Sequence, residues 1–273
     1  MVRIALCLLF VFSALQATLL EDKIESFVGQ KQYKTQKNLI RILFKNESRF
    51  VHEDGSVDDI KVLEQLKKSG LLKLFYKNPQ TLNLSLFTKG HSLIFMKVIN
   101  ETLSSMGYNY FLTKQVKRDN NGFVWDIVLS TEHIVNPIIF AKKLTSQGCS
   151  LDSIDKMHEN EWKYTINTDN IEIEARKIEA NTTAKLKKPI KPYWIVVENM
   201  SSISFRSKLA DRWHPNIVFF DANLQIIRDY RKDTVANTLK LKIPINAKYV
   251  KVADMYTLDN IKRGMSVYLR RRN

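Results

Sequence analysis

The spacing of apolar residues changes along the chain and divides it into parts with different predicted structures. From 18 to 77, apolar residues recur at helical spacing, which predicts helices that bury one face. This spacing is set by Leu39, Ile40, Leu43 and Phe44, and then by Ile60, Leu63 and Leu66. Asn78-Pro79 is a turn signal that closes the stretch. We therefore expect a helical segment over 18–79.

The next part, 80–168, alternates strand and helix patterns. Strands are expected at 82–87, 108–116, 123–129 and 149–154, with 162–166 extending or pairing with the last of them, and helices at 91–106 and 138–147. Gly107 and Gly148 follow the two helices, where glycine can take a positive φ. The strand starts Leu82 and Phe123 have the same separation as these glycines. This order predicts a ferredoxin-like split βαββαβ domain.

The last part of the chain has the pattern of an all-β domain. The stretch 169–192 is polar, small and basic, and we expect a linker there. From 193 to 273, short strand patterns alternate with turn signals, which predicts an antiparallel β-sandwich. The expected fold class is therefore α+β, with a helical segment, a ferredoxin-like domain and a C-terminal sandwich.

Two segments of this last part suggest a family. Residues 213–217 (Trp-His-Pro-Asn-Ile) lead into an apolar strand, and Ala247–Asp254 forms a strand after Ile243-Pro244. In both respects the part resembles the galactose-binding-like jelly-roll domains of carbohydrate- and surface-binding proteins. The resemblance implies a jelly-roll-like sandwich. An immunoglobulin-like sandwich has the same features and remains open.

The first residues have the pattern of a secretory signal peptide. Arg3 precedes the apolar run Ile4–Leu15, and small residues over Ala14–Ala17 end it. The run is too short to span a hydrocarbon core of about 30 Å as a helix. We expect cleavage after Ala17, so that 1–17 is removed and the protein is periplasmic. A retained anchor is the alternative, because 18–20 (Thr-Leu-Leu) lengthens the apolar run.

The charge of the chain limits the classes of partner that are expected. The formal net charge is +15, which favours polyanions such as lipid head groups, acidic polysaccharides or acidic protein faces. Export separates the protein from nucleic acid, but leaves peripheral membrane contact open.

Removal of Cys7 leaves Cys149 alone, so that no intramolecular disulfide can form. An exported protein without a disulfide fits a bacterial periplasm.

No catalytic motif is present in the sequence. It contains no HExxH, GxSxG or CxxC motif and no phosphate-binding glycine loop. The five histidines are never at metal-ligand spacing to one another. We therefore expect no catalytic residue, no metal site and no cofactor, while a hydrolase with a non-obvious site remains an alternative.

The candidate ligand-binding residues lie in the predicted sandwich. Aromatic and arginine side chains near strand ends can stack on sugars and hydrogen-bond to hydroxyls or carboxylates. The candidates are Arg206, Arg212, Trp213, His214, Asp221, Asp254 and Tyr256. The alternative is that Trp213 packs into the core and the charged side chains are solvated.

A modification site is also predicted. Glu179-Ala180-Asn181-Thr182-Thr183 matches the extended acidic sequon of bacterial N-glycosylation systems such as that of Campylobacter, with Asn181 as the acceptor. The chain is rich in lysine and isoleucine and poor in glycine. In this respect it resembles uncharacterised exported proteins of Campylobacter and Helicobacter type.

Together these features predict an exported, non-catalytic binding or assembly protein that docks to an envelope protein or complex. The alternative is a protein that binds a glycan, peptidoglycan included, through the C-terminal sandwich.

Overall fold

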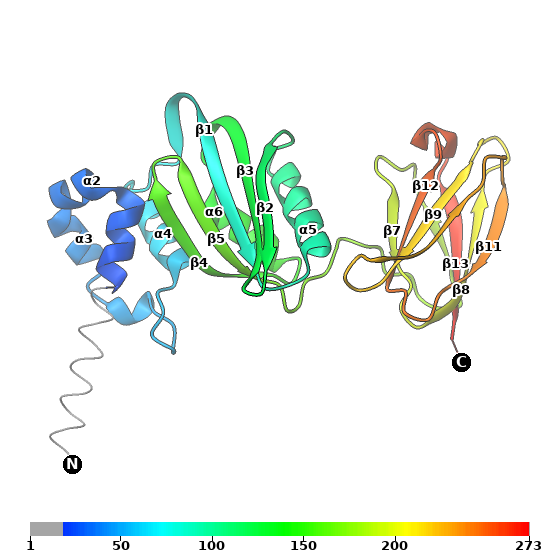
Figure 1. Ribbon diagram of the computed structural model, residues 1–273, viewed down its shortest axis with the longest axis horizontal. Coiled ribbons are helices and arrows are strands. Elements are labelled where there is room, and N and C mark those ends of the chain that lie inside the picture. Colours follow the sequence, from blue (N-terminus) through cyan, green and yellow to red (C-terminus); the bar gives the residue numbers. More distant parts are fainter. Residues whose placement is uncertain (1–18, 273) are drawn as a thin grey trace, which may run out of the picture. The chain divides into compact units, whose positions relative to one another are not determined.

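The computed structural model describes residues 19–272 and divides the chain into two compact units (Figure 1). Unit 1 ends at Glu172 and unit 2 begins at Ile173. The predicted signal peptide, 1–17, lies outside the described residues. None of the helices in the described part of the chain is both long and apolar enough to span a membrane. The fold class is α+β, with strands predominating.

The first part of unit 1 is helical up to Lys68, as its apolar spacing predicts. The predicted helical segment runs to 79, but residues 75–79 belong to the strand Phe75–Thr88, so that Asn78-Pro79 lies within a strand and does not end a helix. Its helices are 19–28, α2 (Gln30–Thr35), α3 (Lys37–Leu43), the 3₁₀ helix η1 (Glu47–Arg49) and α4 (Asp59–Lys68). Helix 19–28 is anchored by Lys23, whose Nζ lies 3.1 Å from Asp59 Oδ2 and 2.8 Å from Asp155 Oδ1. Phe27 on this helix stacks on Trp162 with 6.1 Å between ring centroids. The helical segment therefore packs on the rest of unit 1.

A five-stranded sheet forms the body of unit 1. Its strands are β1 (Phe75–Thr88), β2 (Leu112–Asp119), β3 (Gly122–His133), β4 (Ser150–His158) and β5 (Glu161–Asn167). The helices α5 (Ser92–Ser105) and α6 (Pro137–Thr145) follow β1 and β3 in the chain. The predicted order strand, helix, strand, strand, helix, strand is present, and β5 is a further strand.

The position of β5 separates this sheet from the predicted ferredoxin-like arrangement. The strand order is β2-β3-β1-β5-β4, and β5 runs parallel to β1. In a ferredoxin-like sheet the strand after the second helix would lie beside β1, but here β4 is displaced to the edge. Trp162, Tyr164 and Ile166 of β5 are all buried, whereas β4 buries only Ile154. The more apolar strand thus takes the inner position beside β1, and β4 takes the edge.

Unit 2 contains two four-stranded sheets whose neighbouring strands are all antiparallel. One has the order β10-β9-β12-β7, formed by Ile226–Arg231, Pro215–Phe220, Tyr249–Asp254 and Tyr193–Val196. The other has the order β11-β8-β13-β6, formed by Thr238–Lys242, Met200–Ser207, Met265–Arg271 and Thr183–Leu186. The 3₁₀ helix η2 (Leu258–Ile261) precedes β13.

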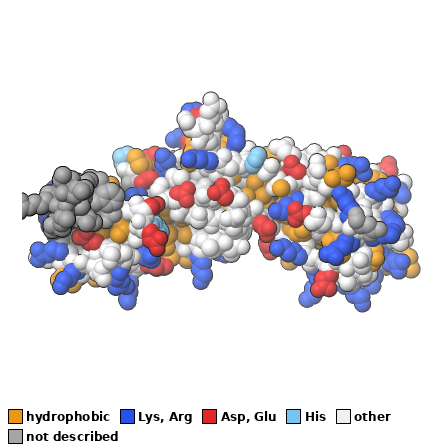
Figure 2. Space-filling model, turned by 90° about the horizontal axis from the view of Figure 1, so that it is seen from below, with side chains coloured by type: hydrophobic (Ala, Val, Ile, Leu, Met, Phe, Trp, Pro, Cys, Tyr) orange, Lys and Arg blue, Asp and Glu red, His pale blue; other side chains and the backbone are white. Residues whose placement is uncertain are grey.

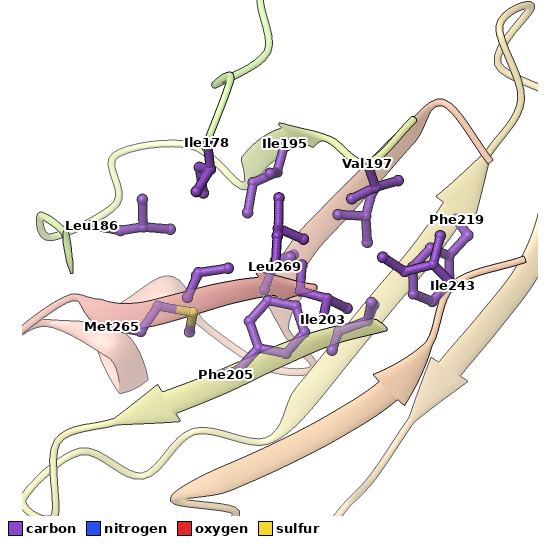
Figure 3. Close-up of a cluster of buried hydrophobic side chains, with 14 of the residues drawn as sticks. Ile178, Leu186, Ile195, Val197, Ile203, Phe205, Phe219, Ile243, Met265 and Leu269 are labelled. Carbon is purple, nitrogen blue, oxygen red and sulfur yellow. The ribbon is translucent and has the colours of Figure 1, made fainter. Parts of the chain in front are cut away.

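The two sheets of unit 2 share one hydrophobic core (Figure 3). Ile195 of β7 points toward Leu269 of β13, and Phe205 of β8 and Phe219 of β9 belong to the same cluster. Alternate residues of β7, β8, β9, β12 and β13 enter this core, because successive side chains of a strand point to opposite faces. The outward side chains are thereby left to form two separate surfaces.

The predicted linker, 169–192, differs from the structure. It contains β6, which pairs with β13, and it contributes Ile178 and Leu186 to the core of unit 2. This stretch is rich in lysine, and only Ala184 and Leu186 of β6 face inward. A strand with so few apolar residues does not stand out from a polar linker in the sequence.

Candidate functional site

Trp213, the central aromatic candidate, is a core residue of unit 2. It is 0% exposed, its ring meets Phe205 edge-on at 5.7 Å between centroids, and its Nε1 donates to Ala253 O over 2.9 Å. A ring in this position cannot stack on a sugar. The structure therefore corresponds to the alternative interpretation, in which Trp213 packs into the core.

Asp254, His214 and Tyr256 come together where β12 ends and β9 begins. Asp254 Oδ2 accepts from His214 N at 2.7 Å, and Oδ1 accepts from Tyr256 N, Thr257 N and Asn260 Nδ2 at 2.8–3.0 Å. Burial raises the pKa of Asp254, but these hydrogen bonds outweigh burial and leave the pKa below 3.8. The carboxylate thus holds two loops together, and its oxygens are occupied by the protein's own donors.

The other candidates are dispersed. Asp221 lies beyond the opposite end of β9 and caps a turn by accepting from Asn223 N and Gln225 N. Arg212 is exposed beside Trp213. Arg206 is also exposed, but it lies on β8 in the other sheet. The seven candidates therefore do not form one site.

Arg206 belongs to a surface that the sequence analysis did not identify. In the β11-β8-β13-β6 sheet, the strand registers align the outward residues into rows across the sheet. The rows are Lys185–Ser266–Arg206–Thr238, Thr183–Tyr268–Ser204–Lys240 and Arg270–Ser202–Lys242. We call this surface the basic face.

The basic face carries positive charge without any acidic residue. Its exposed cations are Lys185, Arg206, Lys240, Lys242 and Arg270. The four strands contain neither Asp nor Glu, and none of the ion pairs among the described residues involves these five side chains. On the side of the molecule seen in Figure 2, acidic and basic side chains lie among one another. The basic face is therefore a local concentration of charge.

A groove of about 520 Å³ lies in the basic face. Arg206 and Lys240 are diagonal neighbours on β8 and β11, which places their Cα atoms about 7–8 Å apart. Tyr268, 36% exposed, lines the groove between hydroxyl side chains. These hydroxyl residues are Thr183, Ser204, Thr238 and Ser266. The groove thus combines two unpaired cations, an accessible aromatic ring and several neutral hydrogen-bonding groups.

The outer face of the other sheet has a different composition. By the same alternation, its outward residues on β9, β12 and β7 are Asn216, Val218, Phe220, Tyr249, Lys251, Ala253, Trp194 and Val196. Lys251 is the one charged residue among them, and β10 adds Asp229 and Arg231, which form an ion pair with each other. A row of cations without acidic residues is therefore a property of one sheet of unit 2 and not of both.

Part of the basic face has a sequence signal. Leu239 and Leu241 alternate with Lys240 and Lys242, which places both lysines outward. The remaining residues come from strands far apart in the chain. Their convergence depends on the pairing of β6 with β13 and of β8 with β11, which a single sequence does not encode visibly.

Two features of residues 19–272 concern nucleophilic and metal chemistry. Cys149 is 3% exposed, and burial raises the pKa of its thiol to about 11. Among residues 19–272, no three His, Cys, Asp or Glu side chains are grouped so as to hold a metal ion.

Asn181, the predicted glycosylation acceptor, is exposed in the turn before β6. Its backbone has φ 61°, its N–H donates to Leu269 O over 2.7 Å, and its Oδ1 accepts from Arg271 N over 3.3 Å. The acceptor is thus accessible, but it is tied to β13 and not part of a flexible linker.

Comparison with known proteins gives a structural likeness and no homologue. No protein-family model and no curated protein matches the chain, so that the resemblance to Campylobacter and Helicobacter proteins remains a prediction. A Streptococcus pneumoniae fucose binding module, SpX-3, is 16% identical over 33% of this chain and 73% of that chain, with a TM-score of 0.25. The lectin domain of lectinolysin, solved with Lewis B antigen, is 18% identical over 34% and 72%, with a TM-score of 0.23. The chain thus has a weak structural resemblance to carbohydrate-binding modules, which does not establish a common function.

Proposed function

We propose that unit 2 binds an acidic glycan on its basic face. The observation that carries the proposal is the groove, where Arg206 and Lys240 have no carboxylate partner and Tyr268 is accessible between hydroxyl groups. Two neighbouring cations without a counter-charge repel each other, and an anionic ligand relieves this repulsion. Arg206 can hold a carboxylate or sulfate through two parallel hydrogen bonds.

A glycan fits the neutral groups of the groove as well as its charge. Sugar rings present apolar faces that stack on aromatic side chains, and Tyr268 offers such a ring. Ser204 and Ser266 flank the tyrosine across the sheet and along its own strand, and their hydroxyls can donate to and accept from sugar hydroxyls. A bare phosphate would use the cations but not the ring.

The proposal is tested with the full-length protein and polysaccharides of known charge. Polygalacturonate, a sulfated polysaccharide and neutral dextran are compared by isothermal titration calorimetry at several salt concentrations. We expect the acidic polymers to bind, with affinity that falls as salt rises. Binding of dextran equal to that of the acidic polymers would contradict the proposal.

Variants locate the binding. Arg206→Gln with Lys240→Gln should weaken binding more than about tenfold, because each lost charged hydrogen bond is worth roughly 1.5–3 kcal/mol. The matched control, Arg228→Gln with Lys232→Gln, removes two exposed cations outside the basic face and should leave affinity within about twofold. Tyr268→Ala should weaken polygalacturonate binding, but not the retention of phosphate or of anionic vesicles. If both double variants weaken binding equally, the groove is not the site.

Three further statements remain proposals drawn from the sequence. They are export to the periplasm, docking to an envelope protein or complex, and glycosylation of Asn181. Mass spectrometry of the protein purified from its own cells tests the first and third together, through the N-terminal residue and the mass added at Asn181.

A further inference from the structure

A second, larger groove of about 1200 Å³ lies in unit 1. One wall is the segment 27–36, which includes the end of helix 19–28 and α2. The other wall includes the segment 73–80, with the start of β1, and Lys156 and Glu159 also line the groove. Both walls belong to the same compact unit, so that the groove does not depend on how the two units are placed.

The first residues of β1 are not fully paired with the neighbouring strands of their own sheet. Phe75 pairs with His133 and Gln80 with Thr131, so that the register leaves the four residues between them without partners in β3. Pairing with β5 begins only at Asn83. In this described segment, therefore, residues 76–79 have no register partner in either neighbouring strand, and Tyr76, Lys77 and Asn78 among them line the groove.

The polar side chains of the groove suit a peptide backbone. Five carboxamide residues line it, namely Gln30, Gln32, Gln36, Asn78 and Gln80. A carboxamide presents the same donor and acceptor pair as a peptide group and can bond to it on both sides. One of these groups, Gln32 Nε2, already donates to Leu71 O over 3.2 Å, which shows this mode of contact within the chain itself.

The charge of the groove selects an acidic ligand. Lys31, Lys73 and Lys77 are exposed, and none of them has an ion-pair partner among the described residues. Lys156 contributes a fourth positive charge, although its Nζ donates to Phe27 O over 3.0 Å. Glu159 is the one acidic residue of the lining. The groove is therefore positive overall.

An apolar side chain completes the site. Phe75, the first residue of β1, is 64% exposed and lines the groove together with Lys73 and Lys77. An exposed aromatic ring with a lysine two residues away on either side favours an extended ligand that presents an apolar side chain between acidic ones on the same face. Because successive side chains of an extended peptide point in opposite directions, these residues occupy every second position of the ligand.

We propose that this groove binds an extended, acidic segment of a partner protein. Charge complementarity selects the acidic segment, and the carboxamides and the residues of β1 without a register partner, 76–79, select a peptide. Residues 1–17 of the same chain contain neither Asp nor Glu, so that the charge argument does not favour them as the occupant. The site is separate from the basic face and does not rest on glycan binding.

The test uses the full-length protein and three fluorescein-labelled octapeptides. The first, called the Glu–Leu peptide, places Glu and Leu in turn at every second position with Ser between them (Glu-Ser-Leu-Ser-Glu-Ser-Leu-Ser). The second replaces Glu by Gln, and the third, the Lys–Leu peptide, replaces Glu by Lys. In fluorescence anisotropy titrations, we expect saturable binding of the Glu–Leu peptide and binding at least about tenfold weaker for the other two. Equal binding of the Lys–Leu peptide, or no saturable binding of the Glu–Leu peptide, would overturn the proposal.

A matched pair of variants places the binding in the groove. Lys31→Gln, Lys73→Gln and Lys77→Gln together remove the three unpaired charges but keep their size. Lys67→Gln, Lys68→Gln and Lys163→Gln remove three exposed lysines of unit 1 outside the lining. The first triple variant should raise Kd at least about tenfold and the second less than about twofold. Equal effects of the two overturn the assignment to this groove.

A polyanion without a peptide backbone tests whether the groove recognises the backbone of its ligand as well as the negative charge. Polygalacturonate is added to the complex with the Glu–Leu peptide, using the Arg206→Gln, Lys240→Gln protein so that the basic face does not consume it. Retention of the peptide supports recognition of its backbone. Complete displacement of the peptide at equal charge concentration means that the groove binds any polyanion through its charge, and this result refutes a peptide-specific site.

Discussion

Asp254→Asn separates a structural role of the predicted ligand site from a binding role. The substitution keeps the size of the side chain and replaces one carboxylate oxygen by an NH₂ group. Because Asp254 Oδ2 accepts from His214 N at 2.7 Å, the new amide places a donor against a donor. The three bonds to Oδ1 remain, but they lose the negative charge that strengthens them.

The expected loss in the free energy of unfolding of unit 2 is about 2–4 kcal/mol. The lost bond from His214 accounts for roughly 1.5–3 kcal/mol, because the acceptor is charged and its side chain is 0% exposed. Weakening of the three remaining bonds supplies the rest. The control is Asp229→Asn on β10, whose carboxylate is 57% exposed and pairs only with Arg231. Its effect should stay within about 0.5 kcal/mol.

The pH dependence gives a second signature. The folded state holds the pKa of Asp254 below 3.8, so the carboxylate stabilises the fold above that value and the stabilisation is lost as pH falls through the folded-state pKa. The stability difference between wild type and Asp254→Asn should therefore be full at pH 7 and shrink below about pH 4. Urea unfolding followed by tryptophan fluorescence measures it, with Trp213 beside the affected loops.

One result would refute this reasoning. If Asp254→Asn unfolds like wild type at pH 7 but loses binding to polygalacturonate, then Asp254 contacts a ligand, as the sequence analysis predicts. The loops would then be held by other contacts.

Three further predictions concern unit 1. Gly148→Ala should destabilise unit 1 by several kcal/mol more than Gly107→Ala. Both glycines have positive φ, but only at Gly148 would a Cβ strike a neighbouring main-chain carbonyl. Urea unfolding of the two variants compares their stabilities. Lys23→Met should cost about 3–5 kcal/mol at pH 7 by leaving buried Asp59 without its cation. Burial already raises the pKa of Asp59, so a carboxyl that is more easily protonated in the folded state should make this cost smaller as pH falls toward 4 in the same assay. Cys149 should resist a thiol-specific chromogenic reagent at pH 8 until urea unfolds unit 1, and rapid labelling of the native protein would contradict its burial.

Local patterns predicted the elements of unit 1 better than their arrangement. The helix that Pro137 starts and Gly148 follows is visible in the sequence, because capping and turn chemistry act between neighbouring residues. The insertion of β5 between β1 and β4 is not, because it depends on which strand can bury Trp162 and Tyr164 against the rest of the unit. Strand order is decided by such long-range packing.

The candidate site was less accessible to sequence reasoning than the fold. The aromatic and charged residues near Trp213 in the sequence predict a ligand site. In the structure, however, Trp213 packs into the core and Asp254 holds two loops together. The basic face joins side chains from 183 to 270, and no local pattern links Lys185 to Arg206. A surface made by strand pairing becomes visible only when the registers are known.

The basic face has a consequence for association between copies of this protein. Its sheet is open at both sides, with β6 and β11 as edge strands. Exposed edge strands invite pairing with another chain, and lysines on them oppose it because the same charges would meet across the seam. Lys185 on β6 and Lys240 and Lys242 on β11 hold these positions. Neutralising them, by mutation or by a bound polyanion, should therefore promote aggregation through the sheet edges, and solubility becomes a property that ligand and lysines control together.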